Sequence, residues 1–93
     1  MARKYEWIMY PQQNDLPGIT GSVSRVRSID EAKRQLEDFS RDTHHDDVSA
    51  TLYAYSDEAW AEALEFYNVG CPFDYPDRLI ERGARGGLKV SRA

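Results

Sequence analysis

Alternating apolar and polar positions near the amino end of the chain predict two β-strands. Residues 4–10 are rich in aromatic and aliphatic side chains, and Pro11 is expected to end the strand that they form. Apolar side chains fall on both faces of this strand, which favours a central place in a sheet. Residues 22–27 predict a second strand, in which Val23 and Val26 differ in parity, as they would at a bulge or at a sheet edge.

The segment that follows the second strand has a helical repeat of apolar positions. One face of this repeat carries the side chains Ile29, Ala32, Leu36 and Phe39. Ser28 and Glu31 form a capping-box pattern, in which the Ser28 hydroxyl accepts from the Glu31 amide and the Glu31 carboxylate reaches back to Ser28. We therefore expect a helix that begins after Ser28 and ends near residues 41–43.

Residues 48–55 form the clearest predicted strand, because small apolar side chains alternate with hydroxyl-bearing ones along it. The apolar set, expected to pack under the helices, is Val48, Ala50, Leu52 and Ala54. The other set is Ser49, Thr51, Tyr53 and Tyr55. Since side chains alternate between the two faces of a strand, we expect Tyr53 and Tyr55 to form an exposed aromatic patch on an open sheet face. The alternative is that this face packs under the loop of residues 11–22.

A second helix is predicted directly after this strand. Ser56 is a suitable N-cap, and Gly70 suits the left-handed residue that follows a helix. The apolar stripe of this helix consists of Trp60, Ala63, Leu64 and Tyr67. We expect this stripe to form one core with the first helix and the apolar side of residues 48–54.

Two short strands are predicted at the carboxy end, over residues 78–82 and 88–91. The glycine-rich residues 83–87 between them can supply the positive φ angles of a tight hairpin turn. The element order is then ββαβαββ, which indicates an α+β fold with two helices packed on one face of a small, mainly antiparallel sheet. With 93 residues and no linker, residues 1–93 are expected to form a single domain.

Composition narrows the class of protein. Aromatic residues make up 12% of the chain, which excludes a disordered tail. No apolar run approaches the ~20 residues of a membrane span, and the amino end lacks the apolar region of a secretory signal. Cys71 is the single cysteine, so no internal disulfide can form. These observations favour a cytoplasmic protein that has no membrane partner.

Charge divides the chain into an acidic middle and a basic carboxy-terminal segment. Residues 30–77 carry three basic and thirteen acidic side chains, whereas residues 78–93 carry five basic and one acidic. The acidic middle repels a phosphate backbone, so nucleic acid is disfavoured as a general partner. The basic hairpin still offers a local strip for phosphate groups, and a nucleic-acid-binding regulator that uses this hairpin is the alternative function.

No arrangement of reactive side chains in the sequence indicates catalysis. The one cluster of possible metal ligands is His44, His45, Asp46 and Asp47, and adjacent side chains diverge in a regular element instead of sharing an ion. Cys71 follows the predicted end of a helix, where the helix dipole raises a thiol pKa and disfavours a nucleophile. We expect no catalytic residue, no cofactor and no metal, and therefore a protein that is not an enzyme.

Surface side chains carry the functional prediction instead. Tyrosine is frequent at protein interfaces because it brings a large contact area at low entropic cost. We expect Tyr53 and Tyr55, joined by Arg82 and Arg85 of the hairpin, to bind a partner protein. That partner is another protein or a second copy of the chain, since so small a core gains from such cover.

The carboxy-terminal quarter of the chain carries a further pattern. It consists of residues 71–83, Cys-Pro-Phe-Asp-Tyr-Pro-Asp-Arg-Leu-Ile-Glu-Arg-Gly, and residues 85–90, Arg-Gly-Gly-Leu-Lys-Val. This pattern resembles the ends of small accessory proteins of unassigned function that actinobacteriophages encode. The resemblance implies a phage accessory protein that acts in the host cytoplasm, where it binds and modulates a bacterial host protein. It implies no catalytic residues.

Overall fold

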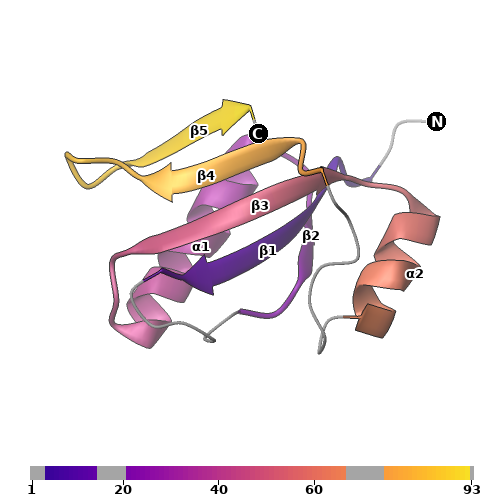
Figure 1. Cartoon of the computed structure of the whole chain (residues 1–93), viewed down its shortest axis with the longest axis horizontal. Helices are drawn as coiled ribbons and strands as arrows, with labels where there is room; N and C mark the ends of the chain where they lie inside the picture. The colour runs from indigo at the N-terminus through magenta and orange to yellow at the C-terminus, as the bar shows by residue number, and fades with distance from the viewer. Residues whose placement is uncertain (1–3, 15–20, 67–74, 93) are drawn as a thin grey trace.

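The computed structural model describes residues 4–14, 21–66 and 75–92 of the chain, and Figure 1 shows their arrangement. These residues form two helices and one five-stranded sheet, and the predicted α+β class and element order are confirmed. The elements are β1 (Trp7–Gln13), β2 (Ser24–Val26), α1 (Ile29–Thr43), β3 (Val48–Ala54), α2 (Asp57–Phe66), β4 (Arg78–Arg82) and β5 (Leu88–Arg92).

Each strand of the sheet runs antiparallel to its neighbours, in the spatial order β2-β1-β3-β4-β5. β1 and β3 pair along their whole lengths, from Trp7 opposite Ala54 to Gln13 opposite Val48. β1 is therefore an interior strand, as its two apolar faces predict. β2 pairs over only three residues and forms one edge of the sheet, which explains the irregular apolar pattern around Val26.

Pro11 lies within β1 instead of ending it, so the predicted end of this strand is wrong. The Pro11 carbonyl accepts a hydrogen bond from the Gly21 N–H at 3.0 Å, on the side of β1 where β2 lies. Because the N–H and C=O of one strand residue point the same way, the N–H that proline lacks would also have pointed to that side. The pairing of β1 with β3 therefore loses no hydrogen bond, and the pairing with β2 has stopped at Met9.

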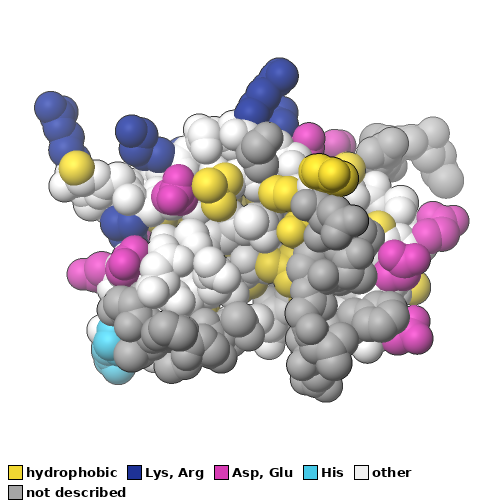
Figure 2. Space-filling model, in the orientation of Figure 1, with side chains coloured by type: hydrophobic (Ala, Val, Ile, Leu, Met, Phe, Trp, Pro, Cys, Tyr) yellow, Lys and Arg dark blue, Asp and Glu magenta, His cyan; other side chains and the backbone are white. Residues whose placement is uncertain are grey.

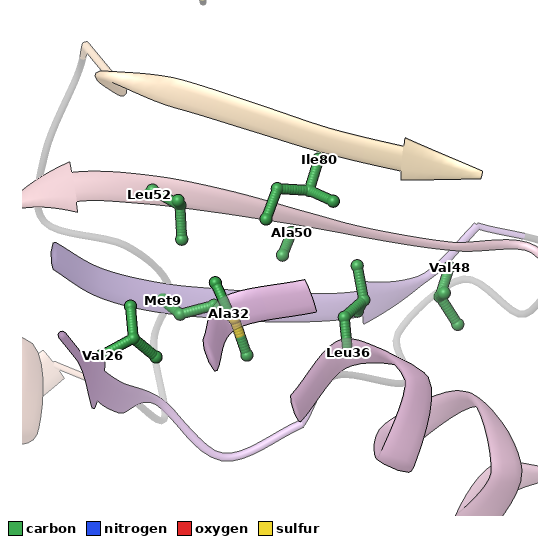
Figure 3. Packing of buried hydrophobic residues seen from close by; sticks show 8 residues of the cluster. All are labelled: Met9, Val26, Ala32, Leu36, Val48, Ala50, Leu52 and Ile80. Carbon is green, nitrogen blue, oxygen red and sulfur yellow. The ribbon is translucent and has the colours of Figure 1, made fainter. Parts of the chain in front are cut away.

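α1 lies behind the sheet in Figure 1, and its apolar face packs against the sheet. Figure 3 shows the packed side chains Met9, Val26, Ala32, Leu36, Val48, Ala50, Leu52 and Ile80. Ile29 and Phe39 pack against the same cluster, whereas Ala54 at the end of β3 is exposed. The predicted core is therefore confirmed for the first helix and residues 48–52.

Both ends of α1 are capped. Ser28 Oγ accepts from the Glu31 N–H at 3.1 Å, as the sequence predicts. The Glu31 carboxylate, however, accepts from the Arg27 N–H at 2.9 Å instead of from Ser28. This hydrogen bond from the Arg27 backbone lowers the pKa of Glu31. At the other end, His44 has a φ of 59°, and its N–H donates to the Arg41 carbonyl.

α2 does not pack on the same sheet face as α1, which corrects the expected placement of both helices on one face. Met9 and Val26 point into the core under α1, so their neighbours Ile8 and Arg25 point to the opposite face. The Arg25 guanidinium lies 4.9 Å from the centre of the Trp60 ring of α2. Figure 1 shows α2 beside the end of the sheet at which β3 finishes.

The start of α2 is predicted correctly, and its buried positions are predicted in part, since Ala63 of the expected stripe is fully buried and Trp60 is half-buried. Ser56 Oγ accepts from the Ala59 N–H at 3.0 Å, which confirms the predicted N-cap. Leu64 is 48% exposed, so its predicted place in the core is wrong. The predicted roles of Tyr67 and Gly70 fall outside the described residues.

Candidate functional site

The turn between β4 and β5 contains a glycine with a positive φ angle, Gly86. The Gly83 N–H donates to the Gly87 carbonyl at 2.7 Å, and the Gly86 N–H donates to the Gly83 carbonyl at 3.0 Å. Gly86 has a φ of 91°, a conformation that glycine adopts without steric cost. A three-residue loop whose last residue has positive φ is a common hairpin connection, so the predicted glycine-dependent hairpin is confirmed.

The side chain of Arg82, the last residue of β4, bonds this hairpin to α1 and to the segment after α1. Its Nε donates to the Asp46 carbonyl at 2.9 Å, and its Nη1 donates to the Gly86 carbonyl at 2.8 Å. Its Nη2 lies 2.7 Å from Glu37 Oε1 and donates to Ser40 Oγ at 3.2 Å. The Arg82 side chain is only 15% exposed, so contacts within the chain occupy a residue that the sequence assigns to partner binding.

The ion pair between Arg82 and Glu37 shifts the pKa values of both groups. The hydrogen bond from Arg82 lowers the pKa of Glu37, and the same bond raises the pKa of Arg82. The Glu37 side chain is 47% exposed, so solvent screens the pair and limits its effect on stability. The structural role of Arg82 therefore does not depend on the ion pair alone, because the same side chain also bonds to the Asp46 and Gly86 carbonyls and to Ser40 Oγ.

Substitution of Arg82 tests this anchoring. Arg82→Gln is expected to lower the free energy of unfolding by about 2 kcal/mol, because several acceptors lose a charged donor. Glu37→Gln should cost ~0.5 kcal/mol at neutral pH. Urea unfolding measures both values, and an Arg82→Gln variant as stable as wild type would contradict the anchoring.

Acid pH separates the ion pair from the other bonds of Arg82. Because the folded-state pKa of Glu37 is lowered, the pair stabilises the fold above the unfolded-state pKa and loses its effect as the pH falls through the folded value. The stability difference between Glu37→Gln and wild type should therefore shrink as the pH falls below the ordinary pKa of a glutamate, about 4.3, whereas that of Arg82→Gln should persist in part. A Glu37→Gln difference that does not change with pH would argue against the ion pair.

Three basic side chains of the hairpin are exposed: Arg85 in the loop, and Lys89 and Arg92 on β5. We call these three residues the hairpin cations. Lys89 lies opposite Glu81 of β4, and Arg92 lies opposite Arg78. Figure 2 shows Lys and Arg side chains projecting outward from the side of the molecule that β4 and β5 form. Of the four predicted partner-binding residues, Arg85 is the one that is exposed.

Tyr53 does not contribute to an open aromatic patch, so the predicted exposure of this residue is wrong. It lies on the sheet face opposite α1, as the alternation along β3 predicts, but it is only 8% exposed. Its ring packs edge-on against Tyr10 with 5.4 Å between ring centroids. Ile8, which lies opposite Tyr53 in β1, is fully buried on the same face. Tyr53 is thus part of a second packed region.

Tyr55 belongs to a separate group of aromatic and basic side chains near the start of α2. Its ring centroid lies 5.6 Å from that of Tyr5, and its hydroxyl donates to Asp57 Oδ1 at 2.8 Å. The Arg25 guanidinium lies 4.4 Å from the Tyr5 ring centroid as well as close to Trp60. Sequence reasoning gave Arg25 no role, because its aromatic neighbours Tyr5 and Trp60 come from two separate parts of the chain.

The structure does not bring the four predicted partner-binding residues together. Tyr53 and Tyr55 lie at and just beyond the carboxy end of β3, whereas Arg82 bonds to Asp46 just before β3 begins. Arg85 extends farther in the same direction, in the loop beyond β4. The predicted single surface of tyrosines and arginines is therefore two regions at opposite ends of β3.

The described residues contain no group of three or more His, Cys, Asp or Glu side chains placed to hold one metal ion. His44 caps α1, and the His45 N–H donates to the Ser40 carbonyl at 3.2 Å. Cys71 lies outside the part of the chain that the structure describes. Within that part, neither helix has the length and apolar character needed to cross a membrane.

Comparisons of the chain with protein-family models, with curated proteins and with solved structures find no match. Its surfaces are therefore the basis for inferring a role. The exposed hairpin cations, on a turn that Arg82 holds in place, are the feature of these surfaces that best suits binding.

Proposed function

We propose that this chain is a non-catalytic protein-binding module that contacts an acidic surface of its partner through the hairpin cations. The partner that we infer is a bacterial host protein, which the chain modulates by occupying its surface in the host cytoplasm. The resemblance of the carboxy-terminal segment to actinobacteriophage accessory proteins supports a bacterial host protein as the partner.

The observation that carries the proposal is the contrast between Arg82 and the hairpin cations. Arg82 holds the hairpin at the backbone of Asp46 and Gly86, while the hairpin cations are exposed. A backbone that is already held in place loses little conformational entropy on binding. Exposed cations also speed the encounter with a partner of opposite charge. Together these properties suit a preformed recognition surface.

Phosphate groups would also be attracted to a basic hairpin, so nucleic acid is the alternative partner. The described part of α2 opposes this alternative, because it carries four acidic side chains, Asp57, Glu58, Glu62 and Glu65, and no basic one. These exposed side chains repel a phosphate backbone that extends beyond the hairpin. Three cations alone support only weak and strongly salt-dependent nucleic-acid binding. An acidic protein surface is the better match.

Charge reversal on the hairpin tests the proposal. Arg85→Glu combined with Arg92→Glu should reduce recovery of the partner about tenfold or more, because two attractive contacts become repulsive. The fold should survive, since Arg92→Glu places a carboxylate opposite Arg78 and favours the β4–β5 pairing. Cross-linking of the tagged protein in an actinobacterial lysate, followed by quantitative mass spectrometry, measures the recovery.

A matched control distinguishes the effect of the hairpin cations from the effect of a changed net charge. Lys4→Glu combined with Arg34→Glu changes the net charge equally at exposed sites outside the hairpin, and it should recover the partner as wild type does. Unchanged recovery with the hairpin variant, or equal loss with both variants, would contradict the proposal. Recovery that nuclease treatment abolishes would favour the nucleic-acid alternative.

A further inference from the structure

Among the residues that the structure describes, the outer side of β5 is a free edge of the sheet. In the described part of the chain β5 pairs with β4 alone, from Arg82 opposite Leu88 to Arg78 opposite Arg92. Figure 1 shows β5 at the margin of the sheet, on the side away from β2. A strand in this position presents backbone N–H and C=O groups that can pair with another strand.

The turn geometry determines which groups of β5 point outward. The Gly83 N–H donates to the Gly87 carbonyl, so these residues form a hydrogen-bonded pair. Hydrogen-bonded and non-hydrogen-bonded pairs alternate along an antiparallel ladder. The N–H and C=O groups of Leu88, Val90 and Arg92 therefore point away from β4. This edge offers three residues with regularly spaced donors and acceptors.

The side chains of β5 specify what an added strand must carry. Leu88 and Val90 lie on the α1 face, where they pack against the core but are only half-buried. Lys89 is exposed on the opposite face, and Arg92 adds a cation near the end of the strand. Directly opposed side chains of paired strands interact, so apolar groups suit Leu88 and Val90, and carboxylates suit Lys89 and Arg92.

A second copy of the chain fits this edge poorly. Two β5 strands paired antiparallel about Val90 would place Leu88 of one copy opposite Arg92 of the other. The same pairing would bring the two Lys89 ammonium groups close together between the two strands, where they repel each other. Lysine on an edge strand discourages such pairing. The charges that repel a second copy attract a strand of opposite sign.

We propose that the free edge of β5 binds an extended segment of the partner protein as an added antiparallel strand. The segment carries apolar side chains opposite Leu88 and Val90 and acidic ones opposite Lys89 and Arg92, and its backbone bonds to Leu88, Val90 and Arg92. This inference rests on the proposed function and deepens it, because it states which part of the partner the hairpin recognises and how.

A synthetic peptide of the matching pattern, acetyl-Glu-Thr-Ile-Glu-Val-amide, is the probe for this edge. Read from its amino end, it places its residues opposite Arg92, Ser91, Val90, Lys89 and Leu88. Titration into ¹⁵N-labelled full-length protein should shift the amide signals of Leu88, Val90 and Arg92 saturably, because their N–H groups gain acceptors. NMR is suited to the weak binding expected of so short a peptide.

Two N-methylated peptides distinguish backbone pairing from charge attraction. Methylation of the isoleucine nitrogen removes a donor that faces β5 and should weaken binding about tenfold. Methylation of the threonine nitrogen, which faces away from β5, should change it less than about twofold. The charge-reversed peptide acetyl-Lys-Thr-Ile-Lys-Val-amide should bind at least about tenfold more weakly than the acidic one.

Equal binding of the two methylated peptides, shifts confined to residues outside β5, or no saturable shift at all would overturn the added-strand proposal. So would sedimentation showing that the chain dimerises through β5, detected as a loss of dimer on Val90→Pro. These failures are distinguishable from failure of the proposed function. If partner recovery still depends on Arg85 and Arg92 while the peptide does not bind, the binding module stands and its recognition of a strand does not.

Discussion

Leu36→Ala in α1 is expected to lower the free energy of unfolding by about 3 kcal/mol. The Leu36 side chain is fully buried, and it belongs to a core cluster whose other members come from α1 and from four strands of the sheet. The paired strands cannot close over the lost volume, so a cavity term adds to the lost burial. In a domain of this size, such a loss is about half of the total stability. The midpoint of urea unfolding measures it.

Leu64→Ala in α2 removes the same atoms and is the matched control. Leu64 is 48% exposed, so the expected change is below about 1 kcal/mol. If the two variants had equal midpoints and equal slopes in urea, the two helices would contribute alike to the core, contrary to the structure.

Tyr53→Ala is expected to destabilise the fold by about 3 kcal/mol, since the residue is 8% exposed and packs against Tyr10. Tyr53→Phe keeps the ring and should cost much less, about 1 kcal/mol. Thermal unfolding followed by circular dichroism measures both changes. A Tyr53→Ala variant with wild-type stability would contradict the burial of Tyr53 and would support the open sheet face that the sequence predicts.

Tyr55→Ala provides a comparison on the same strand face. Tyr55 is half-buried and loses a ring contact with Tyr5 and a hydrogen bond to the exposed Asp57. We expect a cost of about 1 kcal/mol. A larger effect of Tyr55→Ala than of Tyr53→Ala would contradict the burial of Tyr53.

Features that depend on neighbours in the sequence were predictable. The N-caps Ser28 and Ser56 and the hairpin turn at Gly86 each depend on a few adjacent residues, and the structure has all three. The apolar face of α1 was also predictable, because the 3.6-residue repeat specifies one side of a helix. The end of the first strand was predicted wrongly at Pro11. Whether a proline interrupts a strand depends on which neighbouring strand its nitrogen faces, and the sequence does not show this.

Features that depend on distant parts of the chain were not predictable. Alternation along β3 gives the face on which Tyr53 lies, but not whether other groups cover that face. The stripe on α2 includes the buried Ala63 but does not show that Leu64 is exposed, and the contact between Trp60 and Arg25 joins elements far apart in the sequence. Net charge likewise cannot show that Arg82 bonds to the Asp46 carbonyl while Arg85 is exposed.

Pro11 has a consequence for the size of the complexes that this protein can form. A sheet that accepts strands on both sides can link molecules into open chains, whereas one open side gives a finite pair. On the β2 side the edge is three residues long, and β1 beyond it presents a proline without an N–H. Among the described strands, β5 is therefore the longer edge at which a further strand can be added. A strand added at β5 gives a one-to-one complex that does not grow further. This limit protects a protein with an exposed sheet edge from polymerising.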